Sequence, residues 1–258
     1  MGEPGEGVNP SISEIKQTTK EIVGDKILGN TDPRTLTQEQ FSTSPDLLFH
    51  GAISPFEFRN DFDFENSGTE GSITFGCGLY TIDNKETAQH YAEVRASHSR
   101  GPHPPTTMEF LPYDARVLDL RAKGDPNDNG SFPYDLAVKW KVRFDDYAAN
   151  ATYPDTFGGE ISKHSDTDYA AHLEEIVKPD TYIHPRVLQM THLNRFLGPP
   201  WSKMFSDFMV EQGYDGAILI EAAENKKLVP KEELVSQPTY VFYNMDKIGT
   251  YDAWQKKK

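Results

Sequence analysis

Short apolar runs near both ends of the chain, some of them alternating with polar residues, have the pattern of β-strands. Through the middle of the chain, apolar residues recur instead with the spacing of helices. The expected strands lie at 47–50, 73–82, 107–111, 116–120, 217–220 and 239–243. Strands at both ends with helices between them predict an α+β fold, in which one sheet joins distant parts of the chain.

Start signals and periodicity predict the helices. Asp32-Pro33 is typical of a helix start and predicts a helix to about Phe41. Asp83-Asn84 predicts a second helix, which runs to about Ala96. After a turn-rich loop at 123–130, the pattern is mostly helical, with loops expected at 152–165 and 179–181. We therefore expect a helical insertion at about 121–200 within a domain that spans 32–258.

Residues 1–31 form a polar leader, for which a short helix at about 12–22 is the only regular structure indicated. The leader has no apolar core of the kind that a secretory signal peptide carries. No run of about 18 apolar residues occurs, so no membrane span is expected. The sequence thus favours a cytoplasmic protein, or one delivered into a host cell without a classical signal peptide.

The charge balance and the cysteine count narrow the function classes. With 26 basic and 40 acidic residues the net charge is −14, which disfavours nucleic acid as a partner. Cys77 is the single cysteine, so no intramolecular disulfide and no multi-cysteine zinc site can form, and a small buried side chain is its simplest role. His98 and His103 lie around a proline-rich loop that supplies no carboxylate, and no metal is expected there.

Three segments contain residues that are candidates for catalysis or ligand binding. His50 ends an apolar strand and precedes Gly51, an arrangement that by itself is most often structural. Gly76 and Gly78 interrupt the next strand pattern, which indicates a bulge or a close approach of the backbone to another group. Tyr91 follows on the helix after that strand, where a tyrosine alone is usually part of the core.

Taken together, these segments resemble the catalytic domain of the poly(ADP-ribose) polymerases and the diphtheria-toxin-like ADP-ribosyltransferases. The family motifs are Leu-Leu-Trp-His-Gly, then Phe-Gly-x-Gly-Ile-Tyr-Phe-Ala-Asp with a second tyrosine eleven residues after the first, and finally Glu-Tyr-x-Val-Tyr-Asp. Here 47–51 reads Leu-Leu-Phe-His-Gly, 75–83 reads Phe-Gly-Cys-Gly-Leu-Tyr-Thr-Ile-Asp, and Tyr91 follows Tyr80 by eleven positions. The third motif corresponds to 239–244, Thr-Tyr-Val-Phe-Tyr-Asn. The resemblance covers about 46–96 and 205–250.

The resemblance implies a split β-sheet core with flanking helices, and a protein that uses NAD as a substrate. It implies that the backbone of Gly51 meets the nicotinamide amide, that His50 bonds a ribose hydroxyl, and that Tyr80 and Tyr91 stack on the ring. In the family the carboxylate of the third motif stabilises the cation that forms when the glycosidic bond breaks. The four residues are therefore expected to converge on one cleft, and the implied activity is transfer of ADP-ribose to a protein substrate by an enzyme, effector or toxin.

The chain departs from the family pattern at four places. Ala52 and Ala88 replace serines that contact the ribose and the amide, although Thr87 is adjacent to the second, and Cys77 replaces a lysine. Thr239 replaces the glutamate, and a hydroxyl has no charge with which to stabilise a cation or to activate a sugar hydroxyl near neutral pH.

These departures leave alternatives open. Single transfer of ADP-ribose is favoured over chain elongation, with a carboxylate supplied by the acceptor or by one of the loop acids Glu221, Glu224, Glu232 and Glu233. A catalytically inactive module of the same fold, which binds NAD, ADP-ribose or a protein, is the alternative. An RNA 2′-phosphotransferase shares the fold, but the acidic charge disfavours it.

Overall fold

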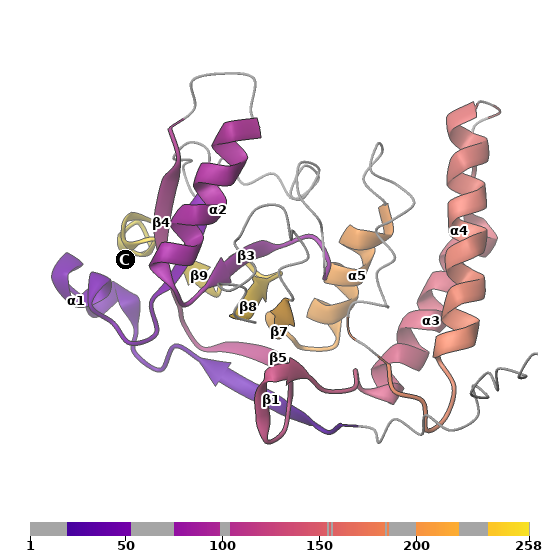
Figure 1. The fold of residues 1–258 in the computed structure, drawn as a ribbon, viewed down its shortest axis with the longest axis horizontal. Coiled ribbons are helices and arrows are strands. Elements are labelled where there is room, and N and C mark those ends of the chain that lie inside the picture. The colour runs from indigo at the N-terminus through magenta and orange to yellow at the C-terminus, as the bar shows by residue number, and fades with distance from the viewer. Residues whose placement is uncertain are drawn as a thin grey trace, which may run out of the picture.

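Nine strands of the described residues form one large, strongly curved sheet (Figure 1). The structure is a computed structural model, and it describes residues 20–52, 75–98, 104–153, 155, 157–183, 185, 200–221 and 237–257. Along the sheet the strand order is β1-β5-β7-β8-β3-β2-β4-β9, with β6 paired to β5. The strands are β1 (Ile22–Leu28), β2 (Leu48–Ala52), β3 (Leu79–Ile82), β4 (Thr106–Pro112), β5 (Ala115–Ala122), β6 (Asp125–Asn129), β7 (Gly216–Glu221), β8 (Gln237–Phe242) and β9 (Ile248–Gly249).

Most neighbours in the sheet are antiparallel, and β5 and β7 are the parallel pair. The weakest joint lies between β2 and β3, where a single register pair, Phe49 with Ile82, connects the two fully described strands. By contrast, β2 forms five register pairs with β4, and β3 forms four with β8. The sheet thus narrows to one register pair at this joint, and the mixed sheet with its helices places the fold in the α+β class.

Six α-helices are described, and they cover the sheet at different places. They are α1 (Gln38–Ser42), α2 (Lys85–His98), α3 (Tyr134–Asn150), α4 (Phe157–Ile176), α5 (Pro200–Glu211) and α6 (Tyr251–Gln255). Helix α2 packs on β2, β3 and β4, whereas α3 packs on both α4 and α5. No described helix is long and apolar enough to cross a membrane.

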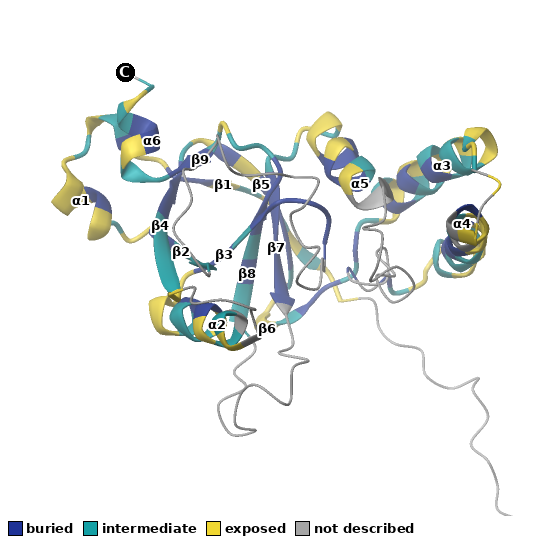
Figure 2. Ribbon diagram, turned by 90° about the horizontal axis from the view of Figure 1, so that it is seen from above, coloured by how far each residue is buried: buried dark blue, intermediate teal, exposed yellow. Residues whose placement is uncertain are grey.

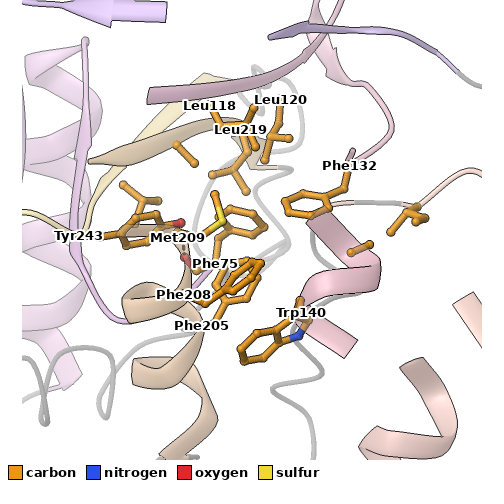
Figure 3. Packing of buried hydrophobic residues seen from close by; sticks show 14 of the residues in the cluster. Phe75, Leu118, Leu120, Phe132, Trp140, Phe205, Phe208, Met209, Leu219 and Tyr243 are labelled. Atoms are coloured by element: carbon orange, nitrogen blue, oxygen red, sulfur yellow. Dashed lines mark hydrogen bonds between the residues drawn. The ribbon is translucent and has the colours of Figure 1, made fainter. Parts of the chain in front are cut away.

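Alternate residues of the central strands enter two separate cores. The outer face of the sheet carries Leu118, Leu120, Ala217, Leu219 and Val241, which pack on aromatic side chains of α3 and α5 (Figure 3). There Phe205 lies 5.0 Å from Phe75 and 5.0 Å from Trp140, measured between ring centroids. Edge-to-face contacts of this kind add to the stabilisation from burial alone.

The inner face of the sheet carries the second core. Its buried residues come from strands on both sides of the curve and include Leu48, Leu79, Phe110, Val117, Ile218 and Phe242. Figure 2 shows how the strands surround this interior, with β4 on one side and β7 on the other. The curvature therefore lets one sheet enclose a core against itself, in addition to the core that it shares with the helices.

The structure corrects four of the sequence expectations. Strand β1 lies within the assumed leader 1–31 and pairs with β5, so the sheet begins before residue 32. The helix expected at 32–41 is a 3₁₀ turn, Pro33–Thr35, followed by the short α1, which Thr37 caps. Strand β6 occupies the expected loop 123–130, and α4 begins at Phe157 inside the expected loop 152–165.

The helical character expected for 121–200 is confirmed in the middle of this range and is wrong at its start. Helices α3 and α4 lie within 121–200 as expected, and their side chains join the outer core. The end of β5, up to Ala122, and the whole of β6, Asp125–Asn129, occupy the start of this range instead. Residues 184 and 186–199 of the insertion, and 1–19 of the leader, lie outside the described residues.

Removal of the Phe205 side chain is expected to destabilise the fold strongly. Phe205 is fully buried and touches aromatic rings from three other segments, so Phe205→Ala should lower the free energy of unfolding by about 3–5 kcal/mol. The matched control is Val142→Ala on α3, because Val142 is 62% exposed. Urea unfolding followed by circular dichroism measures both, and a loss below about 1 kcal/mol for Phe205→Ala would contradict the packing described here.

Candidate functional site

The joint between β2 and β3 brings the first two family-like motifs together. Past the pair Phe49–Ile82 no further register pair joins these two strands, and the ring of His50 bonds across instead, with Nδ1 2.7 Å from the carbonyl oxygen of Tyr80. A carbonyl can only accept, so Nδ1 carries the proton in this contact. The imidazole of His50 is thereby oriented by the strand that carries Tyr80.

Gly51 lies directly beneath α2. A Cβ atom at this position would be 2.1 Å from the carbonyl oxygen of Ala88 and 3.0 Å from the backbone nitrogen of Ala92. No side chain fits in that space, and Ala88 and Ala92 are themselves almost fully buried. Glycine on the strand and alanines on the helix therefore permit the close approach of α2 to β2. The alanine at 88, which departs from the family pattern, fits this packing.

Three side-chain hydroxyls hold the segment Phe75–Gly78, which precedes β3. The carbonyl oxygens of Phe75, Gly76 and Cys77 accept hydrogen bonds from Tyr243 (3.0 Å), Tyr80 (2.7 Å) and Ser206 (2.7 Å), respectively. The hydroxyl of Tyr80 also accepts from the backbone nitrogen of Phe75 at 2.8 Å.

Gly76 and Cys77 have structural explanations in this segment. Gly76 has a φ of +86°, which favours glycine, and a Cβ there would be 2.6 Å from the hydroxyl of Ser206. Cys77 is buried and forms no disulfide, in agreement with its interpretation as a small buried side chain.

Tyr80 and Thr239 share the outer face of the sheet, and His50 faces inward. Tyr80 pairs with Val241 and packs against the outer core, and Thr239 is only 5% exposed between Ile82 and Leu219. The ring of His50 contacts the inner-core residue Phe110 edge-to-face, with centroids 6.5 Å apart. Convergence of these side chains on one bound nucleotide stays a prediction.

The two remaining predicted residues lie on α2. Thr87 is half-buried in the first turn, where its backbone nitrogen donates to the side chain of Asn84 at 2.8 Å. Tyr91 is 42% exposed one turn later, beside the helix face that contacts Gly51. Asn84 thus starts the helix as the sequence indicates and fixes the position of both residues relative to β2.

The structure describes only some of the candidate loop acids and one of the two histidines at 98 and 103. Glu221 ends β7, where its backbone pairs with Gln237, while Glu224, Glu232 and Glu233 lie outside the described residues. His98 is the last residue of α2 and His103 lies outside the described residues. In the described part of the chain, no group of three or more histidine, cysteine or acidic residues is placed to hold a metal ion.

A polar cluster on the inner face was missed by sequence reasoning. The carboxylate of Asp119 is fully buried and receives hydrogen bonds from Arg121, at 2.8 Å from Nε and 2.5 Å from Nη2. Burial, and then the charge of Asp83, raise the pKa of nearby Tyr240 to about 12, while Arg121 acts in the opposite direction. The available signal was Asp119 and Arg121 alternating with leucines in an otherwise apolar strand.

Comparison with models of protein families, with curated proteins and with solved structures finds no match to this chain. The geometry of the site and the motif spacing are therefore the basis for a functional proposal.

Loss of the Tyr80 hydroxyl is expected to destabilise the fold. Tyr80→Phe leaves the backbone nitrogen of Phe75 and the carbonyl of Gly76 without this partner, so the free energy of unfolding should fall by about 1–3 kcal/mol. Tyr134→Phe is the control, because the Tyr134 side chain is 40% exposed at the start of α3. Equal stability of Tyr80→Phe and wild type in urea unfolding would show that these two bonds do not hold the segment.

Tyr240 is expected to contribute to the loss of stability at alkaline pH. The unfolded chain releases this proton near pH 10, whereas the folded chain keeps it until its pKa of about 12. The stability that this difference provides is complete below pH 10 and is lost as the pH rises through about 12. Urea unfolding between these pH values should show a shallower decline for Tyr240→Phe than for wild type. Identical declines would mean that the hydroxyl is not shielded from water.

Proposed function

We propose that this protein is a mono-ADP-ribosyltransferase, which transfers single ADP-ribose units from NAD to a protein substrate. One observation carries the proposal: the sheet opens between β2 and β3 at the residues where the two motifs meet, His50-Gly51 and Leu79-Tyr80. The motif spacing adds to it, because Tyr91 sits on the helix that packs over Gly51. The proposed setting is the cytoplasm, of the producing cell or of a host.

The chemistry of NAD fits the groups at this joint. A carboxamide needs one donor and one acceptor, and its proposed partner is the backbone of Gly51, at the point where β2 no longer pairs with β3. The rings of Tyr80 and Tyr91 offer flat surfaces for nicotinamide, and His50 offers a nitrogen oriented by the carbonyl of Tyr80. These residues would bind the dinucleotide and orient the glycosidic bond that breaks.

The residue at 239 restricts the reaction to single transfers. Cleavage of the bond between nicotinamide and ribose leaves a sugar cation, which a carboxylate stabilises and a threonine does not. A polymer would further require activation of a ribose hydroxyl by a base, and Thr239 has no basic group near neutral pH. An acidic acceptor residue brings its own carboxylate to the site, and single transfer to such a residue is therefore the favoured outcome.

The burial of Thr239 favours a second candidate function, a binding module without turnover. Thr239 is 5% exposed and lies between two aliphatic neighbours on adjacent strands. This position contributes to packing and not to catalysis. A module of this kind would hold NAD or ADP-ribose at the same joint and release it unchanged.

Labelled NAD separates the two candidates. The purified protein, incubated with adenylate-labelled NAD and cell lysate, should label one or a few proteins with single units. His50→Gln should reduce labelling at least about tenfold, because the oriented imidazole is lost. His164→Gln on α4 is the control, since the His164 side chain is 78% exposed. Binding of NAD without any labelled protein would select the binding module, and the absence of both would reject the NAD site.

A further inference from the structure

Asn129, the last residue of β6, completes the hydrogen bonding of β7 with its side chain. The register pairs of β5 with β7 run only from Val117 to Asp119, whereas β7 continues to Glu221. At Ile220 the carboxamide of Asn129 takes the place of a neighbouring strand. Its Nδ2 donates to the carbonyl oxygen of Ile220 and its Oδ1 accepts from the backbone nitrogen, both at 2.8 Å. Asn129 is only 4% exposed, so the two bonds satisfy backbone groups that are shielded from water.

Gly130, the next residue, is required by the close approach of β1. A Cβ atom at this position would lie 2.7 Å from the side chain of Ile22 and 2.9 Å from the carbonyl oxygen of Glu21. The backbone nitrogen of Gly130 donates to the carbonyl oxygen of Leu120 at 2.8 Å. The contacts with β7 and β1 therefore place an asparagine directly before a glycine, and 129–130 is the one Asn-Gly pair in the sequence.

An asparagine that precedes a glycine is chemically labile, because no Cβ shields the glycine nitrogen. In deamidation this nitrogen attacks Cγ of the asparagine, a bond forms between the two atoms, and the bond from Cγ to Nδ2 breaks. Ammonia leaves with the proton of the glycine nitrogen, and a cyclic imide remains. Water then opens the ring to aspartate or to isoaspartate, in which the main chain continues through the former side-chain carbonyl.

In the folded chain both reacting groups are engaged elsewhere. The carboxamide of Asn129 is held by Ile220, and the N–H of Gly130 is held by Leu120. We propose that Asn129 is a deamidation site that is closed in the folded protein and opens when β6 separates from β5 and β7. The modification would then convert a temporary opening of the sheet into a permanent one.

Neither product of the reaction restores the original contacts. An aspartate at 129 has no N–H to donate to Ile220, and it places a carboxylate beside that carbonyl oxygen in a buried position. An isoaspartate adds one atom to the main chain and displaces the register pair of residue 129 with Arg121. The end of β7 therefore loses its partner once the reaction has occurred.

Peptide mapping by mass spectrometry tests the site on the wild-type full chain. The protein is kept at one mildly alkaline pH, either in buffer or in urea above the unfolding transition. Conversion of Asn129 should be at least about tenfold slower in buffer, because the reaction requires the buried pairing to open first. After the urea is removed, the unconverted chains should regain the native circular dichroism, and the converted chains, separated by ion exchange, should not.

The variant Asn129→Asp reproduces one product without ageing. Its folding equilibrium constant, measured by urea unfolding, should be at least about tenfold lower than that of wild type, because a buried carbonyl loses its donor. Asn127→Asp is the matched control, since Asn127 lies in the same strand, is exposed and gains the same charge. It should fold like wild type.

The outcomes do not depend on NAD, so they test this site separately from the transferase. Slow conversion in buffer, fast conversion in urea and a destabilised Asn129→Asp support the proposal. Equal rates in buffer and urea overturn it, as does conversion of other asparagines but not of Asn129 in urea. Asn129→Asp as stable as Asn127→Asp also overturns it. If Asn129→Asp does not fold at all, the two rates measured on the wild-type chain decide.

Discussion

The single register pair between β2 and β3 is the constraint on which the rest of the site depends. Adjacent strands normally satisfy their backbone groups along the whole shared length, and here that ladder stops after Phe49 and Ile82. The ring of His50 then bonds the carbonyl of Tyr80, so a side chain replaces a backbone partner where the strands separate. Strong pairing of β2 with β4 and of β3 with β8 keeps each part of the sheet intact on either side. The loss of backbone pairing is therefore confined to this one joint, and the strands on either side of it stay fully paired.

The elements that the sequence predicts well are those whose signals are local. Strands β2, β3, β4, β5, β7 and β8 follow apolar runs, and α2 begins where Asn84 caps it. The elements missed are stabilised by distant partners. Strand β1 exposes Val23 and Ile27 and carries charges between them, so its sequence resembles a leader until β5 provides its pairing. Helix α4 starts beside two glycines that are typical of loops, yet Leu173 and Tyr169 bury it against α3 and the outer core.

The sequence could predict which elements of the candidate site are neighbours. It could not predict which face of the sheet each side chain points to. Spacing alone places Gly51, Tyr80 and Tyr91 on a strand, the next strand and the helix after it, and those elements are adjacent in the fold. Whether a side chain faces the inner or the outer core depends on register, and one residue of shift reverses every direction along a strand. The partnership of Asp119 with Arg121 was hidden for a related reason. Alternating charges in a strand indicate a solvated face, and only the curvature of the sheet turns this face inward.

The two faces of β8 have different surroundings, and this difference bears on the residue at position 239. On the outer face Thr239 is buried between aliphatic side chains, and a carboxylate there would lose most of its hydration without a cation to compensate. On the inner face the next residue, Tyr240, pairs with Thr81 and Ile218 on the adjacent strands, and burial raises the pKa of its hydroxyl to about 12. Thr239 therefore serves the packing that keeps β8 between β3 and β7.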